Sequence, residues 1–279
     1  MKKTGILLTA CLCLFLFSNC SQQKDYLSEK GFTKLLTGND WTGWYFKIRS
    51  GDADVAKAVY QLQDGVVHVF NEQFPDSFNI LPKGTKGSND CATHGLFYTQ
   101  KKYSRFILRF DYKWGLRVVA NNFKDWQHDA GVYYHVVNDK IWPEGVEYQI
   151  RYDQITDTNH TGNFWGVPFE WTCDDTGHFA MPSEGGKVQE AKKGQRLAKI
   201  TREFNGMNDQ WNTCEIIVMA NKYSIHKLNG EIINMALNMP MSSGKIGFQS
   251  ETSEIFYRNI RIKEIKEDLP MSYFVKNYK

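Results

Sequence analysis

Several features that would mark a common class of protein are missing from the sequence. No cysteines have the Cys-x-x-Cys spacing or the Cys/His spacing of a metal site. The net charge is only +3, and the 34 Lys and Arg residues are dispersed among 31 Asp and Glu residues, so a nucleic acid partner is not implied. No helix-period pattern extends beyond a few turns, and no repeat is visible. The 279 residues are enough for one large all-β domain or two modest ones.

Only one long apolar run is present, and it lies at the N-terminus. Met1-Lys-Lys-Thr supplies positive charge, and Ile6–Phe17 is apolar but too short to span a bilayer, which is typical of a secretory signal. The run ends in Leu16-Phe-Ser-Asn-Cys20, which resembles the bacterial lipobox, although Asn stands before Cys20 where Gly or Ala is more usual. We therefore expect a signal peptide over residues 1–20 and lipidation of Cys20. The alternative is an unmodified cysteine that ends a plain signal.

A lipidated Cys20 would determine where the protein works. Acyl chains on this residue would anchor the protein in the outer membrane, facing the periplasm or the cell surface. Residues 21–30 are polar and are expected to form the tether to the domain.

The other cysteines limit the number of disulfides. Cys11 and Cys13 would leave with the signal peptide, and three cysteines remain besides Cys20, so at most one disulfide can form among these three. A buried free thiol is the expected state of Cys91, Cys173 and Cys214.

Most of the chain after residue 30 has the pattern of strands and turns. Segments rich in β-branched and aromatic residues alternate with turn residues, and Leu228-Asn-Gly-Glu231 has the strongest short hairpin signal. The pattern predicts an all-β fold, a two-sheet antiparallel β-sandwich of jelly-roll type, over residues 31–266, followed by a tail over 267–279. The clearest strands are Gly65–Phe70, Gly95–Thr99, Arg105–Trp114, Trp211–Met219, Lys222–Lys227, Glu231–Asn234 and Gly244–Gln249.

Two segments interrupt this pattern. Thr156–Gly186 has little strand character and is expected to be a long ordered loop that walls a binding cleft, and Glu184–Lys199 is expected to cross the surface. The first segment contains Asp174, Asp175 and His178, whose side chains suit a divalent cation such as calcium but lack a recognised ligand spacing.

The most informative stretch is a pair of half-polar strands, Asp129–His135 and Gly145–Arg151. The turn residues between them predict an antiparallel hairpin. Because side chains alternate between the two faces of a strand, polar groups of both strands should gather on one face, although a plain solvated face is the alternative. The residues expected to share this face are Asp129, Tyr133, His135, Glu147, Gln149 and Arg151.

Seven motifs follow one another in an order that resembles a known family. They are Gly31–Trp44, Tyr103–Tyr112, Asp129–Tyr134, Gly145–Ile150, Trp211–Thr213, Leu228–Gly230 and Gly244–Ile262. Together they resemble the 3-keto-disaccharide hydrolase domain family of Bacteroidetes. This resemblance implies a concanavalin A-like lectin/glucanase sandwich with a carbohydrate site. The chain departs from the family at Asp129-Ala-Gly131 and at Gln249-Ser-Glu251.

The resemblance also implies a reaction on sugars that a separate pathway oxidoreductase has oxidised to a ketone at C3. The ketone acidifies the C2 hydrogen, so a base can remove this proton, the C1 substituent can leave, and water can add to give net hydrolysis. Glu147 or His135 can act as the base, and Arg151 or a bound divalent cation can stabilise the enolate. The residues expected to bind the substrate are Asp129, Tyr133, Gln149, Trp126, Trp142 and Trp165.

Two other functions agree with the same residues. A non-catalytic carbohydrate-binding lipoprotein could use the same sandwich, because a fold does not prove chemistry. A conventional glycosidase would need a second carboxylate opposite Glu147, with Asp129 or Asp153 as candidates. A structural ion pair between Glu147 and Arg151 and a surface role for His135 are the plainer alternatives for these residues.

Overall fold

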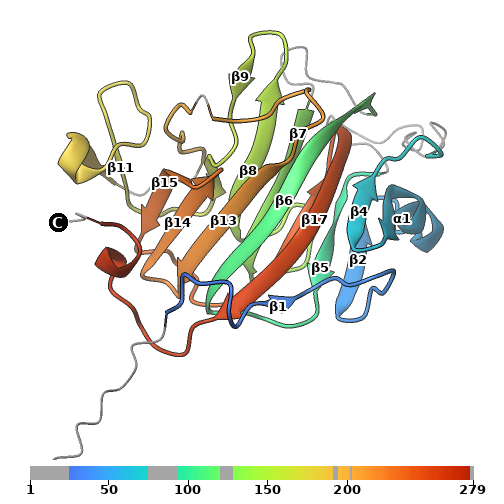
Figure 1. Cartoon of the computed structure of the whole chain (residues 1–279), viewed down its shortest axis with the longest axis horizontal. Helices are drawn as coiled ribbons and strands as arrows, with labels where there is room; N and C mark the ends of the chain where they lie inside the picture. Colours follow the sequence, from blue (N-terminus) through green and yellow to red (C-terminus); the bar gives the residue numbers. More distant parts are fainter. Residues whose placement is uncertain (1–24, 75–92, 120–127, 191–193, 202, 277–279) are drawn as a thin grey trace, which may run out of the picture.

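The chain forms a sandwich of two antiparallel sheets, which confirms the predicted fold class (Figure 1). The computed structural model describes residues 25–74, 93–119, 128–190, 194–201 and 203–276. Among these residues, no helix is both long and apolar enough to cross a membrane.

One sheet, here called the back sheet, has eight strands. Its order is β15 (Glu231–Leu237), β14 (Tyr223–Leu228), β13 (Asn212–Met219), β6 (Arg105–Val118), β17 (Ser253–Glu264), β4 (Val66–Val69) and β3 (Tyr60–Gln63), with β1 (Thr33–Lys34) paired to β17.

The other sheet, here called the site sheet, has seven strands. Its order is β10 (Phe164–Gly166), β8 (Val146–Asp153), β7 (His128–Val136), β16 (Lys245–Ser250), β5 (Gly95–Thr99) and β2 (Trp44–Ile48), with β9 (Thr158–Asn159) paired to β8. The remaining elements are helix α1 (Ala53–Val59), the strand pair β11 (Trp171–Cys173) and β12 (Lys187–Gln189), and the 3-10 helices η2 (Pro182–Glu184) and η3 (Met271–Tyr273).

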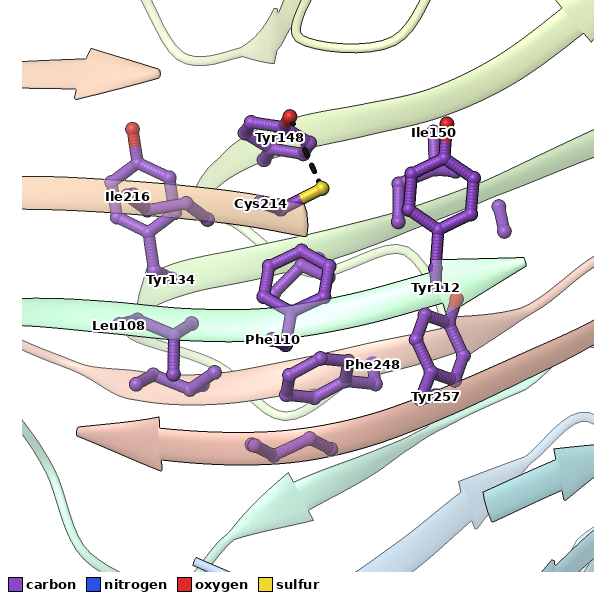
Figure 2. Packing of buried hydrophobic residues seen from close by; sticks show 14 of the residues in the cluster. Leu108, Phe110, Tyr112, Tyr134, Tyr148, Ile150, Cys214, Ile216, Phe248 and Tyr257 are labelled. Atoms are coloured by element: carbon purple, nitrogen blue, oxygen red, sulfur yellow. Dashed lines mark hydrogen bonds between the residues drawn. The ribbon is translucent and has the colours of Figure 1, made fainter. Parts of the chain in front are cut away.

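Alternation along the strands places large apolar side chains between the sheets. Figure 2 shows the centre of this core, where the ring of Phe110 on β6 meets the rings of Tyr148 and Phe248 edge-on, with centroids 6.0 and 5.3 Å away. The Tyr148 hydroxyl donates a hydrogen bond of 3.4 Å to the Cys214 sulfur. Burial of these rings supplies the main stabilisation of the sandwich.

The expected free thiols are confirmed for two of the cysteines. Cys173 and Cys214 are buried and form no disulfide. Cys20 and Cys91 lie outside the described residues.

The structure confirms the hairpin at Asn229-Gly230. Both residues have positive φ, 49° and 88°, and Leu228 pairs with Glu231 across the two-residue turn. In contrast, the segment 156–186 contains three short strands, β9, β10 and β11, where the sequence predicted little strand character. These strands are only two or three residues long, which is too short for an alternating pattern to be recognised.

The two ends of the described chain pack together on the outer face of the back sheet. Tyr26, which falls within the expected tether, is 6% exposed and lies in an apolar cluster with Phe274 and Val275 of the expected tail. The Tyr26 backbone N–H donates to the Tyr273 hydroxyl at 3.0 Å, and Lys263 Nζ donates to the Tyr26 carbonyl at 2.8 Å. From residue 25 onward, the chain is therefore part of the folded domain.

We expect Tyr26→Ala to lower the free energy of unfolding by about 3 kcal/mol, because it removes a buried aromatic ring. Tyr26→Phe keeps the ring and removes only the hydroxyl that donates to Glu267, so its effect should stay below about 1 kcal/mol. Urea unfolding of both variants measures this difference. Equal stability of wild type and Tyr26→Ala would show that the segment does not contribute to folding.

Candidate active site

Strand register brings the polar residues of β7 and β8 together on the outer face of the site sheet. Tyr133 lies opposite Glu147, and Asp129 lies opposite Arg151. Gly131 lies between them, opposite Gln149. The predicted hairpin is therefore confirmed, and five of the six residues expected on one face share it.

The Glu147 carboxyl lies over Gly131. A Cβ atom at residue 131 would be 2.1 Å from Glu147 Oε1 and 3.0 Å from Gln249 Oε1. The missing side chain of Gly131 therefore leaves the space in which the two side chains meet. Gln249 Oε1 is buried and accepts no hydrogen bond from any described residue. Its capacity to accept a hydrogen bond is therefore unused within the described part of the chain.

Asp129 has two polar partners on the neighbouring strand. Its Oδ1 accepts a hydrogen bond of 2.5 Å from Gln149 Nε2, and its Oδ2 lies 3.8 Å from Arg151 Nη1. Arg151, which the sequence suggested as an ion-pair partner of Glu147, thus pairs with Asp129.

Burial raises the pKa of both carboxyls. Desolvation and the nearby charge of Asp129 raise the pKa of Glu147 to about 8, although the Tyr133 hydroxyl and Arg151 act in the opposite direction. Desolvation also raises the pKa of Asp129, while Arg151 and Gln149 favour its ionised form. Because Asp129 has the closer cation, we assign the negative charge to Asp129 and the retained proton to Glu147 near neutral pH.

The raised pKa of Glu147 predicts a pH-dependent stability. Between its ordinary value of 4.5 and about 8, the unfolded chain releases this proton while the folded chain keeps it, so the free energy of unfolding falls as the pH rises. Glu147→Gln removes this loss. Relative to wild type, the free energy of unfolding of the variant should therefore rise by about 4 kcal/mol between pH 4.5 and about 8, measured by urea unfolding.

Glu215 on the back sheet is the matched control, because its pKa shifts the other way. Burial raises its pKa, but Lys227 and Arg109 outweigh burial and lower it. Its stabilising effect is therefore present at neutral pH and lost on acidification. Glu215→Gln should be less stable than wild type at neutral pH. Parallel profiles for the two variants would contradict the assignment of the proton to Glu147.

The expectation that His135 shares the face of Glu147 is wrong. The pairing of β7 with β16 shifts between Tyr133 and Val136, so two residues of β7 lie opposite one of β16. His135 is at this β-bulge with φ of 51°, and its side chain turns to the carbonyls of Ser104 and Met241, 2.9 and 3.2 Å from Nε2 and Nδ1. Its ring packs on Phe106 of the core. His135 therefore cannot act on a ligand beside Glu147.

Two of the three tryptophans expected to bind substrate lie at the edges of the cluster of polar side chains on β7 and β8. Trp165 on β10 lies opposite Glu147 in the strand register and is 44% exposed. Trp142, between β7 and β8, is 45% exposed, and its ring centroid is 4.3 Å from that of His94. Trp126 lies outside the described residues.

Three residues of this site, Gly131, His94 and Gln249, were not among the residues expected to bind or act on a ligand, although Gly131 and Gln249 lie in the two departures from the family. Gln249 is on β16 and His94 immediately precedes β5, and their side-chain nitrogens are 3.3 Å apart. The alternation in Gly244–Gln249 was the available signal for Gln249. Only the fold decides that β16 lies beside β7 and that β5 lies beside β16.

The other acidic residues of interest have structural roles. Asp153 accepts hydrogen bonds from the backbone N–H groups of Ile155 and Thr156 and so caps a turn. Asp174 caps the turn at Thr176 in the same way, at 2.8 Å. Within the described ranges, no three His, Cys, Asp or Glu side chains are grouped as a metal site requires. The expected divalent cation stays a prediction.

Solved structures with similar folds include several proteins that act on or bind carbohydrates. A candidate glycosyl hydrolase of Parabacteroides distasonis is 22% identical, with a TM-score of 0.49 over 87% of this chain and 100% of that chain. A β-glucanase of Bacillus licheniformis is 12% identical, with a TM-score of 0.46 over 85% and 100%. The carbohydrate-binding module CBM66 of Bacillus subtilis is 10% identical, with a TM-score of 0.37 over 84% and 96%.

A search of curated proteins found no match. The model of the 3-keto-alpha-glucoside-1,2-lyase-like domain matches residues 31–263. Because this match covers most of the chain, the chain belongs to the 3-keto-alpha-glucoside-1,2-lyase-like domain family, as its resemblance to 3-keto-disaccharide hydrolases predicted, and membership supports a carbohydrate-active role.

Proposed function

We propose that this protein is an enzyme that cleaves the glycosidic bond of 3-keto-glycosides by elimination followed by hydration. The observation that carries the proposal is the pair of buried carboxyls on one sheet face, Asp129 beside Arg151 and Glu147 over Gly131. One carboxyl is placed to take a proton and the other to give one.

In the first step, the Asp129 carboxylate removes the proton from C2 of the sugar. The electron pair of the C2–H bond forms the C2–C3 double bond of an enolate, and the C3 oxygen takes the negative charge. Arg151 supplies the nearby positive charge that stabilises this anion. Unlike the role considered from the sequence, Glu147 is then not the base.

In the second step, the enolate electrons return to form the C3 ketone and a C1–C2 double bond, and the C1–O bond breaks. Glu147 gives its proton to the departing oxygen. Water then adds to C1, returning a proton to Glu147, while Asp129 returns its proton to C2. Overall, one water molecule is consumed, and both carboxyls return to the protonation states in which they started.

The family supports elimination over conventional glycosidase chemistry, because the model that matches residues 31–263 is that of a 3-keto-alpha-glucoside-1,2-lyase-like domain. A retaining or inverting glycosidase needs two carboxyls that flank the scissile bond. Asp129 and Glu147 project from neighbouring strands on the same face of one sheet, an arrangement that can serve either reaction.

The deciding experiment incubates the purified protein with 3-keto-disaccharides and with the same disaccharides unoxidised, each with and without chelator. We expect cleavage of the 3-keto substrates alone. Release of the 2-hydroxy-3-keto-glycal on the way to the free sugars would identify the elimination. Binding of both sugars without cleavage would favour the non-catalytic carbohydrate-binding protein, and loss of activity with chelator would add a divalent cation to the site.

We also propose that Cys20, which lies outside the described residues, carries the lipid of an outer-membrane lipoprotein that faces the periplasm or the cell surface. The lipobox-like motif supports this, and a pathway oxidoreductase in the same compartment would supply the ketone. Mass spectrometry of the N-terminal peptide from the membrane fraction, with Cys20→Ser as control, tests the modification. An unmodified Cys20 in the mature protein would contradict it.

A further inference from the structure

The segment between β7 and β8, residues 137–145, folds back over the outer face of the site sheet. The Tyr98 hydroxyl on β5 donates to the Lys140 carbonyl at 2.7 Å, and the Tyr45 hydroxyl on β2 donates to Asp139 Oδ2 at 3.0 Å. These strands are the second and third neighbours of β7 on the side away from β8. The segment therefore crosses the sheet instead of forming a short turn at its end.

A group of side chains, here called the latch, fixes this segment. Lys245 Nζ donates to the Tyr45 hydroxyl at 2.7 Å and lies 3.9 Å from Asp139 Oδ2. The Tyr45 and Tyr98 rings stack with centroids 5.7 Å apart. The Tyr98 ring uses the space over Gly247, where a Cβ atom would be 2.5 Å away. The latch thus consists of Tyr45, Tyr98, Lys245 and Asp139.

The latch determines where Trp142 lies. The two ends of the segment are joined by a hydrogen bond of 3.0 Å from the Val137 N–H to the Glu144 carbonyl. This hydrogen bond and the latch together fix the residues around Trp142. The Trp142 ring contacts His94, which in turn contacts Gln249. Gln249 is next to the Glu147 carboxyl over Gly131. A path of contacts therefore runs from Trp142 to the proposed acid.

Trp165 stands on the other side of Glu147. His94, which Trp142 contacts, immediately precedes β5, and Trp165 is on β10. These two strands are four strand spacings apart in the order β10-β8-β7-β16-β5. At the usual strand separation this is roughly 19 Å across the sheet. The span can hold two sugar rings in a row between the two aromatic side chains, whereas a single ring would contact only one of them.

We propose that Tyr45, Tyr98 and Lys245 are positioning residues that hold Trp142 as a fixed wall for a second, neutral sugar ring, and so select disaccharide-sized glycosides over glycosides with a small leaving group. The expected effect on KM rests on the proposed function, because KM can be measured only if the protein turns the substrate over. The expected preference for binding disaccharides over monosaccharides does not require turnover.

The test uses the double variant Tyr45→Phe/Tyr98→Phe, which removes both hydroxyls of the latch but keeps both rings. We expect KM for a 3-keto-disaccharide to rise about tenfold, as the loss of two neutral hydrogen bonds would give, with kcat within twofold of wild type. KM for the methyl 3-keto-glycoside should not change. Tyr26→Phe, a hydroxyl deletion on the back sheet, is the matched control and should leave both KM values unchanged.

Calorimetric titration with unoxidised disaccharide and monosaccharide separates this inference from the proposed function. If wild type cleaves no 3-keto substrate but binds the disaccharide more tightly, and the double variant loses this preference, the proposed function fails while the inference stands. Equal KM changes for both substrates, or a disaccharide preference that survives in the double variant, would overturn the inference.

Discussion

Glu147→Gln is expected to lower kcat on a 3-keto-disaccharide about 1000-fold, within the range that a single general acid contributes. Glutamine has almost the shape of the protonated carboxyl and can occupy the same space over Gly131, but it cannot give a proton to the departing oxygen. The loss should therefore appear in kcat more than in KM. Initial rates for wild type and variant on the same substrate measure this.

A leaving group that needs no proton provides a further check. When the C1–O bond of a nitrophenyl 3-keto-glycoside breaks, nitrophenolate departs as a stable anion, so the variant should recover most of the lost rate of nitrophenolate release on this substrate. Glu215→Gln, a buried glutamate on the back sheet, controls for general destabilisation and should retain wild-type kcat. Unchanged turnover in Glu147→Gln would remove Glu147 from the mechanism.

Gly131→Ala is expected to lower kcat about 100-fold, because it displaces the Glu147 carboxyl from its place. The added methyl carbon would be 2.1 Å from Glu147 Oε1 and 2.9 Å from its Cδ, distances that no side chain tolerates. The carboxyl must move by about 1 Å or more, and displacement of this size at a reacting group can cost a factor of about 100.

Gly115→Ala is the matched control for this substitution. Gly115 lies on β6 in the back sheet, and a Cβ atom there would be 2.2 Å from Glu254 Cδ, so the same kind of collision occurs away from the site. The two variants should lose similar stability in urea, and only Gly131→Ala should lose turnover. If both variants keep wild-type kcat, the position of Glu147 over Gly131 has no catalytic importance.

The alternation of polar and apolar residues was sufficient to predict the sandwich and the composition of one face of the site. Val132 and Tyr148 alternate with Tyr133 and Glu147, and a strand has only two faces, so burying the first pair in the core places the second pair outside it. The departure at Asp129-Ala-Gly131 was also visible, and it proved to lie beneath the Glu147 carboxyl.

His135 shows where the same reasoning fails. Its position is odd-numbered like that of Tyr133, but the bulge opposite β16 changes the phase of alternation after Tyr133. The bulge arises from pairing with a strand more than 100 residues away in the chain, so no local pattern could reveal it.

The sequence by itself determined the fold class, the hairpin of β7 and β8, and the placement of Asp129, Glu147, Gln149 and Arg151 on one face, because side-chain alternation and turn chemistry are local properties. Only the tertiary structure decided that Gln249 and His94 join them, that His135 does not, and that Tyr45 and Tyr98 hold the segment with Trp142 over the sheet. The physical reason is that strand order and register depend on how distant segments share one core. The protonation of Glu147 follows from the same cause, since its burial, and not its position in the sequence, raises its pKa.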